Sequence, residues 1–449
     1  MIGEWCKVAG WGKVPVAESF VVPINDANSV TEAIAHAGQR GSIPRGLGRS
    51  YGDAAQRSGG VLLDTQGLKN IQWVNKEEGI LEAAGGVSIG ELIEYGEAEG
   101  WFPPVTPGTR HVTVGGAIAA DIHGKNHHVA GSFGEHVLLL DLVIPNGETL
   151  RISPRQNTQL FWATVGGLGL TGLILKAQIR MLRVPGTQMM VTTSQTKNLD
   201  ETMQAMKEAD SQYTYTVSWL DLMATGSQLG RGVITKGEHT GGSQKALSKP
   251  LVSVPNWWNI NIVKPSTIRV FNEAWYRKAP AKPKTSQESF GSYFYPLDGI
   301  RQWNLLYGHR GFLQYQFVVP FEAEELLYSI IHRFSKARLP IFLAVLKRFG
   351  QGSKGLISFP KPGWTLTLDL PIPSNNSSIG KLLEKVDFEI AESEGRIYLA
   401  KDSRMRHQHI TRMYPKISEF NEIRKSVDPS NVLISDLSER LRLSFKHAP

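Results

Sequence analysis

Three glycine-rich segments within the first 172 residues constrain this chain more than any other feature. The first segment runs from Pro44 to Asp53 and contains Gly46, Gly48 and Gly52, with arginine and serine between them. Glycine allows successive backbone N–H groups to face outward, and the resulting concave surface binds phosphate. An ordinary glycine-rich turn is the alternative interpretation of this segment taken alone. Glycine contributes 45 of the 449 residues, against a usual share of roughly 7%, so close approach of backbone to a ligand is expected.

The second segment, residues 106–128, combines small residues with histidines. Residues 115–120 are all glycine, alanine or isoleucine, which would allow a flat ligand to lie against the backbone. His123 and His127 are four residues apart, a spacing that suits a metal ion on a helix. Gly124 argues against that helix, and no acidic third ligand is evident. The sequence therefore predicts no metal site here.

The third segment, Val165 to Gly172, matches the G-x-G-x-x-G pattern of dinucleotide-binding folds. That pattern requires a preceding strand, a following helix and an acidic residue about 20 positions later. Here a strand-like run at 173–176 follows, and positions 188–195 contain no acid. A site for a nicotinamide dinucleotide is not predicted, although the glycines still suggest a backbone that approaches a ligand.

Local patterns in the first 185 residues predict a mixture of helices and strands. Ser29 and Glu32 have the spacing of a capping box, which predicts a helix over 29–38. Ser88 and Glu91 repeat this signature before a second helix. The dipeptide at 146–147 is Asn-Gly between two apolar runs, 137–144 and 148–153, which predicts a hairpin.

The character of the chain changes near residues 184–186, Val-Pro-Gly, where we predict a domain boundary. Beyond it, periodicity predicts helices at 200–209, 322–337, 379–392 and 417–426 and strands at 213–219, 312–319 and 365–370. The stretch 237–285 is polar and rich in lysine and proline, and is predicted to form mobile loops with apolar anchors at Trp257 and Trp258.

Composition excludes several classes of protein. Apolar residues make up 41% of the chain and charged residues 20%, so a sizeable core is expected. Cys6 is the single cysteine, which rules out an intrachain disulfide, a cysteine-rich zinc site and an iron–sulfur cluster. The net charge of +8 suits anionic partners. No basic helix or aromatic–basic platform favours nucleic acid, so none is expected as a partner.

No sequence feature predicts insertion into or passage through a membrane. The first residues lack a basic region followed by an apolar stretch, so no secretory signal is expected. No run approaches the 18 or so apolar residues of a transmembrane helix. The expectation is a cytoplasmic protein, with peripheral membrane association left open.

Seven motifs in a fixed order carry a family resemblance that covers nearly the whole chain. They are Arg45-Gly-Leu-Gly-Arg-Ser-Tyr-Gly-Asp53, Pro107-Gly-Thr-Arg110, Val112-Thr-Val-Gly-Gly-Ala-Ile-Ala119, Asp121-Ile-His-Gly-Lys-Asn-His-His128, Phe161-Trp-Ala-Thr-Val-Gly-Gly167, Gly311-Phe-Leu-Gln-Tyr-Gln-Phe317 and Ala400-Lys-Asp-Ser-Arg404. Together they resemble the vanillyl-alcohol-oxidase-type FAD-binding family and, within it, the branch that oxidises polyprenylphosphoryl ribose. This resemblance implies an α+β, two-domain (PCMH-type) fold. Residues 1–186 and 396–449 would form the FAD-binding domain, and residues 187–395 an inserted antiparallel-sheet, substrate-binding domain.

The resemblance implies FAD as the cofactor. Many family members attach FAD covalently through a histidine in the first loop, whereas Arg49 stands at the matching position. We therefore expect non-covalent FAD. The residues implied to bind it are Arg45, Gly46, Leu47, Gly48, Arg49, Ser50, Tyr51, Gly52, Gly108, Thr113, Val114, Gly115, Gly116, Ala120, Asp121, Ile122, His123, Ile174 and Tyr398.

The resemblance also implies the reaction. A polyprenylphosphoryl-β-D-ribose would be oxidised at its 2′-hydroxyl to the 2′-keto sugar, the first half of epimerisation to the arabinose donor for cell-wall polysaccharide. Lys401 and His123 are the candidate catalytic residues, and the sequence does not decide which of them is the base. The residues implied to bind the substrate are Lys125, Trp219, Gln314, Gln316, Lys347 and Thr367.

Partners and rival functions follow from the same reasoning. The keto sugar would pass to a separate NAD(P)H-dependent short-chain reductase. The nearest rival function is a soluble oxidase of the same FAD family that acts on a sugar, an alditol, an aldonolactone or a nucleoside. A flavin-binding but inactive partner protein is a more distant alternative.

Overall fold

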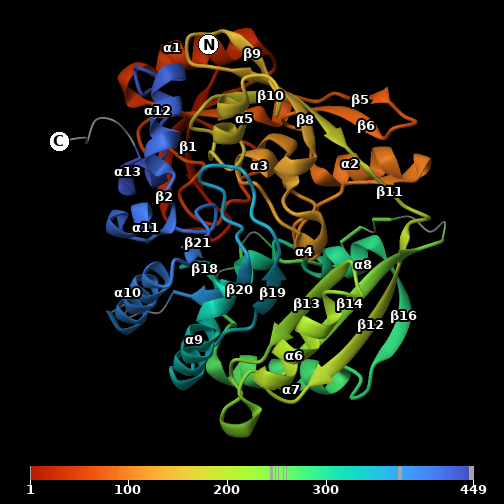
Figure 1. The fold of residues 1–449 in the computed structure, drawn as a ribbon. Coiled ribbons are helices and arrows are strands. Elements are labelled where there is room, and N and C mark those ends of the chain that lie inside the picture. Colours follow the sequence, from red (N-terminus) through yellow and green to blue (C-terminus); the bar gives the residue numbers. More distant parts are fainter. Residues whose placement is uncertain are drawn as a thin grey trace.

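Three large β-sheets organise the chain (Figure 1). The computed structural model describes residues 2–242, 246–247, 249–250, 252–255, 257–258, 260–372 and 377–443. The two smaller sheets lie in the upper half of Figure 1 and the largest in the lower half. The C-terminal helices α11 (Ile410–Met413), α12 (Ile417–Val427) and α13 (Asp436–Arg440) lie in the upper half of the figure, beside the N-terminal strands β1 (Glu4–Ala9) and β2 (Val16–Pro23).

The first sheet supplies the strand that leads into the first glycine-rich segment. Its strand order is β1-β2-β4-β3, from Glu4–Ala9, Val16–Pro23, Val61–Asp64 and Ser42–Arg45. β2 and β3 both run parallel to β4, and α1 (Ala27–Ala37) crosses between β2 and β3. The apolar side chains of β4 are fully buried, as expected for a central parallel strand. β3 therefore ends on a rigid support immediately before Gly46.

The second sheet is antiparallel and carries the other two glycine-rich segments at its margin. Its order is β5-β6-β10-β8-β9, from Ile71–Asn75, Ile80–Ala84, Leu173–Arg180, Val137–Val143 and Thr149–Ile152. The helices α2 (Ile89–Gly96), α3 (Val114–Ala119), α4 (His127–Ala130) and α5 (Thr158–Thr164) connect its strands. A two-stranded sheet, β7 (Trp101–Phe102) with β11 (Leu182–Arg183), closes one end.

The third sheet has eight antiparallel strands. Its order is β16-β12-β14-β13-β19-β20-β18-β21, from Lys284–Ser289, Gln188–Thr196, Gly232–Thr240, Tyr215–Leu220, Ala344–Phe349, Gly363–Pro371, Phe312–Val319 and Arg396–Ile397. β18 pairs with β20 so that Gln314 faces Asp369 and Gln316 faces Thr367. This register gathers polar side chains on adjacent central strands.

Helices cover the eight-stranded sheet and link it to the rest. They are α6 (Leu199–Ala209), α7 (Pro265–Lys278), α8 (Phe290–Phe294), α9 (Glu324–Lys336) and α10 (Ser377–Glu392), followed by α11 (Ile410–Met413), α12 (Ile417–Val427) and α13 (Asp436–Arg440) near the C-terminus. β15 (Val252–Ser253) and β17 (Ile300–Arg301) form a short parallel pair. β15 precedes α7 in the sequence and β17 follows it.

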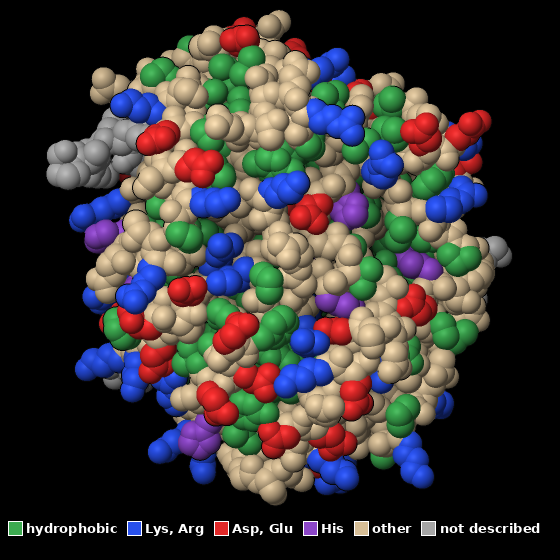
Figure 2. Space-filling model, viewed as in Figure 1, with side chains coloured by type: hydrophobic (Ala, Val, Ile, Leu, Met, Phe, Trp, Pro, Cys, Tyr) green, Lys and Arg blue, Asp and Glu red, His purple; other side chains and the backbone are tan. Residues whose placement is uncertain are grey.

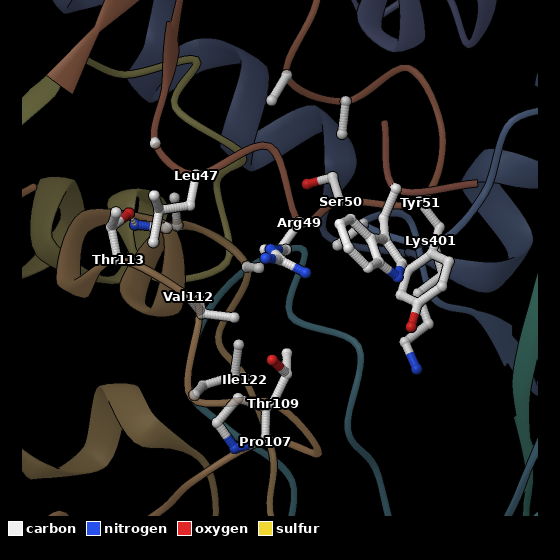
Figure 3. A pocket seen from close by; sticks show the side chains of 18 of the residues that line it. Leu47, Arg49, Ser50, Tyr51, Pro107, Thr109, Val112, Thr113, Ile122 and Lys401 are labelled. Carbon is white, nitrogen blue, oxygen red and sulfur yellow. Dashed lines mark hydrogen bonds between the residues drawn. The ribbon is translucent and has the colours of Figure 1, made fainter. Parts of the chain in front are cut away.

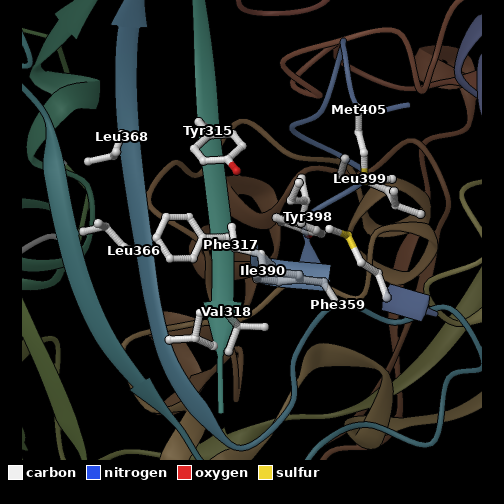
Figure 4. Packing of buried hydrophobic residues seen from close by; sticks show 14 of the residues in the cluster. Tyr315, Phe317, Val318, Phe359, Leu366, Leu368, Ile390, Tyr398, Leu399 and Met405 are labelled. Atoms are coloured by element: carbon white, nitrogen blue, oxygen red, sulfur yellow. The ribbon is translucent and has the colours of Figure 1, made fainter. Parts of the chain in front are cut away.

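One buried apolar cluster contains residues of both the first and the third sheet. Figure 4 shows the part of it around Phe317 and Tyr398. The cluster includes Ile43 and Leu62 of the first sheet together with Phe317 and Leu366 of the third. Tyr398 also belongs to it and stacks on Phe359 with ring centroids 4.6 Å apart. The predicted division into residues 1–186 with 396–449 and residues 187–395 remains a prediction, and β21 of the C-terminal segment pairs with β18 of the large sheet.

Most sequence-predicted elements are confirmed. The hairpin β8–β9 turns at the predicted Asn-Gly, and Ser88 with Glu91 caps α2 in both directions. The helices predicted at 200–209, 322–337, 379–392 and 417–426 correspond to α6, α9, α10 and α12. The cap predicted for the first helix is wrong, because Asp26 accepts from the Ser29 N–H at 2.8 Å and Ser29 Oγ reciprocates. The helix therefore begins two residues earlier than predicted.

The loop prediction for 237–285 is wrong over much of its length. β14 extends to Thr240, α7 occupies Pro265–Lys278, and β16 begins at Lys284. Proline in the first helical turn is compatible with a helix because its missing N–H has no partner there, and only Ile268 and Asn272 of α7 are buried. Most of α7 is therefore exposed, and it lacks the buried apolar stripe from which a helix is predicted. Positions 243–245, 248, 251, 256 and 259 lie outside the described residues.

Candidate active site

The three glycine-rich segments and the large sheet enclose a single deep cavity (Figure 3). Its volume of about 290 Å³ is roughly twenty times the ~15 Å³ that one water molecule needs, so it is large enough to hold a ligand. The predicted site residues that line it are Gly46, Leu47, Gly48, Arg49, Ser50, Tyr51, Gly108, Thr113, Gly115, Gly116, Ala120, Ile122, His123, Ile174, Gln314, Lys347, Thr367, Tyr398 and Lys401.

The loop that follows β3 presents unsatisfied donors to the cavity. Among the described residues, the backbone N–H groups of Leu47, Gly48, Arg49 and Ser50 donate to no protein acceptor. The side chain of Arg49 packs over the Trp11 ring with its guanidinium carbon 3.8 Å from the centroid, and its Nε has no protein partner. Unpaired N–H groups in a partly buried loop are costly unless a ligand accepts from them. A pyrophosphate supplies such acceptors.

Two glycines form a cradle that suits a flat cofactor. A Cβ on Gly46 would lie 2.3 Å from Thr113 Oγ1, so the loop can meet α3 only without a side chain there. A Cβ on Gly108 would meet no protein atom within 4 Å, although Gly108 lines the cavity. The space beside Gly108 is therefore available to a ligand. These residues fit FAD, and the loop 46–50 would hold its pyrophosphate.

The C-terminal segment brings a tyrosine and a lysine to the far end of the cavity. Tyr398 donates its hydroxyl to the carbonyl of Ala120 at 2.8 Å, which fixes the ring against α3. The Tyr51 N–H donates to the Ala400 carbonyl at 3.1 Å, which ties this segment to the first loop. Lys401 then projects into the cavity beside Tyr51, as Figure 3 shows. Two segments about 350 positions apart thus form one wall.

Lys347 has two other lysines near it, Lys125 and Lys401; all three are partly buried, and Lys347 and Lys401 line the cavity. Among the described residues, no acidic group lies within ion-pair distance of Lys125, Lys347 or Lys401. Burial lowers the pKa of Lys125 to about 7 and, with Lys401 and Lys125 nearby, holds the pKa of Lys347 well below its ordinary value. Burial also lowers the pKa of Lys401 to about 8. A lysine with a lowered pKa loses its charge readily, and an anion bound beside it would restore the ammonium form.

His123 sits between Lys347 and Gln316. Lys347 Nζ lies 3.0 Å from His123 Nδ1, and Gln316 Nε2 lies 3.0 Å from His123 Nε2. Burial, with the neighbouring lysine charges, holds the pKa of His123 well below its ordinary value, so the ring is neutral and has one N–H. Both ring nitrogens are therefore engaged by protein groups.

The position of the His123 proton is coupled to the charge of Lys347. If the Gln316 amide donates to Nε2, the proton is on Nδ1 and Lys347 accepts it as a neutral amine. If Lys347 donates as an ammonium, Nε2 carries the proton and Gln316 must accept through Oε1, an atom that is buried without a partner in the present orientation. A bound anion beside Lys347 favours the second arrangement because it stabilises the ammonium.

Asp369 adds a buried carboxylate behind the cavity wall. It accepts from Gln314 Nε2 at 2.6 Å and from the Tyr307 hydroxyl at 3.4 Å. Burial raises the pKa of Asp369 to about 7, and its charge opposes the lowering of the Lys401 pKa. Asp369 was not among the site residues predicted from the sequence. The signal was available, because Thr365, Thr367 and Asp369 alternate along β20 and so share one face.

Several predicted site residues lie outside the cavity lining, and each has another contact. Arg45 donates to the carbonyls of Ala55 and Ala9 and holds the first loop from behind. Gly52 packs against the Asp402 carbonyl, where a Cβ would come within 2.0 Å. These two residues shape the loop and do not line the cavity.

The other five also lie outside the cavity lining, and each has a contact elsewhere in the protein. Val114 is fully buried in α3, and Asp121 accepts from the Gly134 N–H at 2.9 Å. Lys125 donates to the Tyr293 carbonyl and lies 3.9 Å from the centre of that tyrosine ring. Trp219 donates to the Phe342 carbonyl at 3.1 Å. Gln316, as described above, reaches the cavity only through His123.

Other cavity residues escaped the sequence analysis. Trp303 and Asp298 line the cavity although they come from the segment after α8. Asp298 accepts from Thr109 Oγ1 at 2.8 Å and from the Arg110 N–H at 2.9 Å, which joins it to the second glycine-rich segment. No local pattern marks this contact, because its partners are about 190 positions apart in sequence.

The described residues offer neither a metal cluster nor a membrane-spanning helix. In the described ranges, no cluster of three or more His, Cys, Asp or Glu side chains is arranged to hold a metal ion. Of the helices in those same ranges, none has the length and apolar character needed to cross a bilayer. On the face shown in Figure 2, basic and acidic side chains intermingle without a large field of one sign.

Comparisons with known proteins agree with the architecture of this site. A family model described as an FAD binding domain matches residues 19–153, and one described as D-arabinono-1,4-lactone oxidase matches residues 315–441. The chain is 38% identical to decaprenylphosphoryl-beta-D-ribose oxidase of Mycolicibacterium smegmatis over 452 aligned positions, which cover 97% of each protein.

Two further relatives align with smaller shares of this chain. An uncharacterised protein in the mprA 5′ region of Streptomyces coelicolor is 34% identical over 80% of this chain and 100% of its own length. Cytokinin dehydrogenase 2 of Arabidopsis thaliana is 30% identical, but over only 31% of this chain and 28% of its own.

Proposed function

This chain belongs to the decaprenylphosphoryl-β-D-ribose oxidase family of FAD-dependent oxidoreductases, and from that premise we propose that it oxidises the 2′-hydroxyl of a polyprenylphosphoryl-β-D-ribose. The observation that carries the proposal is Lys347, which lines the cavity beside His123 and has no carboxylate in contact among the described residues. A phosphodiester is an anion that this lysine would accept as an ammonium, whereas a neutral sugar offers it no opposite charge.

Substrate recognition would combine this charge with neutral hydrogen bonds. Lys347 lines the cavity and would meet the phosphate as an ammonium, with His123 behind it. Gln314 and Thr367 lie on neighbouring strands at the same wall and would hydrogen-bond the sugar hydroxyls. Asp369 would hold the Gln314 amide in place.

The reaction removes a hydride from the C2′ carbon and a proton from its hydroxyl, which leaves a carbon–oxygen double bond. FAD, when bound, supplies the hydride acceptor. Lys401 is the proposed proton acceptor, because its pKa of about 8 lies near neutrality and both His123 nitrogens are engaged by protein groups. His123 would position Lys347 and would not act as the base.

The 2′-keto product must be reduced by a second enzyme to complete an epimerisation. We propose a separate NAD(P)H-dependent short-chain reductase as the partner, and peripheral association with the membrane that carries a polyprenyl lipid. The arabinose donor formed in this way would serve cell-wall polysaccharide synthesis.

Oxidation of a soluble aldonolactone is the second candidate function. The match of residues 315–441 to the D-arabinono-1,4-lactone oxidase model favours it. A lactone has no phosphate, however, and gives Lys347 no anionic partner.

A lysine substitution separates the two candidates. Lys347→Met should raise the KM for farnesylphosphoryl ribose at least tenfold and leave that for an unphosphorylated ribose derivative unchanged, because only the former offers an anion. Lys381→Met, an exposed position on α10, is the matched control and should behave as wild type. Equal effects on both substrates would contradict a phosphate contact at Lys347.

A further inference from the structure

The segment 246–285 carries most of the excess positive charge of the chain. It holds seven basic residues and one acid, Glu273, whereas the whole chain has a net charge of +8. Glu273 accepts from Arg231 and Arg277 at 2.5 Å each, so its charge is compensated locally. The basic residues are all exposed: Lys249, Lys264, Arg269, Arg277, Lys278, Lys282 and Lys284.

The same segment exposes large apolar side chains on and beside α7. Val270 is 71% exposed, and Phe271 and Trp275, one helical turn apart, are 41% and 43% exposed. The rings of Phe271 and Trp275 are stacked with centroids 6.3 Å apart, and Lys278 Nζ lies 5.8 Å from the Trp275 ring centre. Aromatic and basic side chains therefore occupy one surface of the helix.

The loop that leads into α7 also exposes apolar side chains. Trp257 is 77% exposed, and Ile260 and Ile262 are also exposed. The Ile262 carbonyl accepts from Thr267 Oγ1 at 2.5 Å, which fixes the loop to the first turn of the helix. We call the set Trp257, Ile260, Ile262, Val270, Phe271 and Trp275 the α7 face.

The α7 face is connected to the cavity by apolar contacts. Phe271 meets Phe342 edge to face with ring centroids 5.5 Å apart, and the next residue, Leu343, lines the cavity. Ile268, on the buried side of α7, belongs to an apolar cluster with Trp303, which also lines the cavity. Both contacts place α7 next to residues that line the cavity.

We propose that the α7 face docks on an anionic lipid bilayer, with its apolar side chains in the interfacial layer and its basic side chains among the headgroups. A helix with tryptophan and phenylalanine on one face and lysine and arginine beside them has the composition of an interfacial membrane helix. Protein–protein interfaces are depleted in lysine, which disfavours a protein as the occupant. The proposal rests on the proposed function, because a lipid-linked substrate is what gives docking its purpose.

Vesicle flotation tests this surface directly. The FAD-loaded full-length protein is mixed with vesicles of phosphatidylcholine alone or of equal parts phosphatidylcholine and phosphatidylglycerol. Wild type should float with the anionic vesicles and lose binding as salt rises. Arg269→Glu with Lys278→Glu should reduce partitioning at least tenfold, since each basic residue near the surface contributes about fivefold.

An apolar variant and its matched control complete the design. Phe271→Ser with Trp275→Ser should also reduce flotation at least tenfold, whereas Phe388→Ser, an exposed aromatic on α10 at 53% exposure, should not. Val270→Ser serves as the second apolar variant if the double variant is unfolded by circular dichroism. Wild type that fails to float with anionic vesicles, or α7 variants that float as wild type does, would overturn the proposal.

Turnover of farnesylphosphoryl ribose separates this proposal from the proposed function. This short-chain substrate is supplied without vesicles, so the α7 variants should oxidise it at the wild-type rate. Turnover without vesicle binding would retain the proposed function and reject the α7 face as a membrane surface. Vesicle binding without turnover would retain the surface and reject the substrate.

Discussion

At the scale of single residues, Asp369 lies behind Gln314 and influences the cavity through charge. Its carboxylate raises a Lys401 pKa that burial lowers, and its own pKa of about 7 leaves it ionised where Lys401 titrates. Because the two groups are coupled, the pH dependence of the reaction belongs to the pair and not to either residue.

Asp369→Asn should shift the Lys401 titration to lower pH. The carboxylate raises the Lys401 pKa, so its removal lets that pKa fall below about 8, by about one unit for the loss of an opposite charge nearby. The corresponding limb of the pH profile for flavin reduction should move toward acid, whether the neutral or the charged lysine is the active form. A limb that does not move, or moves toward alkali, would show that Asp369 does not act on Lys401.

The residues that touch the cavity differ in how far sequence could identify them. The glycines and Lys401 stand in compact motifs, so their placement follows from local pattern. Asp369 and Asp298 depend on partners far along the chain, namely Gln314 and Thr109. Strand register and loop packing determine such contacts. Neither can be predicted from a local sequence pattern.

At the scale of elements, local chemistry predicted one helix cap and one turn correctly, misplaced the cap of α1 and missed the exposed helix α7. The cap of α2 and the turn of the β8–β9 hairpin each depend on a few adjacent residues, and both are confirmed. α7 was missed because its burial is limited to Ile268 and Asn272, which leaves no apolar stripe facing a core. The same exposure is what makes the α7 face available for docking.

The loop that contains Gly108 allows a test of cofactor placement. A Cβ there meets no protein atom but enters the cavity, so Gly108→Ala should leave the apo protein as stable as wild type while weakening FAD binding at least tenfold. Gly380→Ala, on α10, also meets no protein atom and should retain FAD. Flavin fluorescence during titration of the apo protein measures both. Wild-type affinity in Gly108→Ala would place the cofactor elsewhere.

At the scale of the whole molecule, the shared apolar cluster should couple the two predicted domains. Ile43 and Leu62 from the first sheet and Phe317 from the third pack in one core, and Tyr398 adds a contact from the C-terminal segment. Neither part can lose its packing without exposing side chains of the other. This coupling should keep the flavin loop at a fixed distance from Gln314 and Lys347 of the large sheet.

Calorimetry of the FAD-loaded protein should therefore show one unfolding transition. Addition of FAD to the apo protein should raise its Tm, because a ligand that binds only the folded state stabilises it. Two resolved transitions, of which only one responds to FAD, would mean that the cluster does not couple the domains.

The most direct test of the account is anaerobic bleaching of the flavin. The purified protein should release FAD on denaturation, because Arg49 stands where a covalent histidine link would form. Farnesylphosphoryl-β-D-ribose should bleach the bound flavin and yield a 2′-keto sugar, whereas xylitol and an aldonolactone should not. Bleaching by the soluble sugars and not by the prenylphosphoryl ribose would contradict the proposed substrate and leave the FAD-dependent oxidase intact.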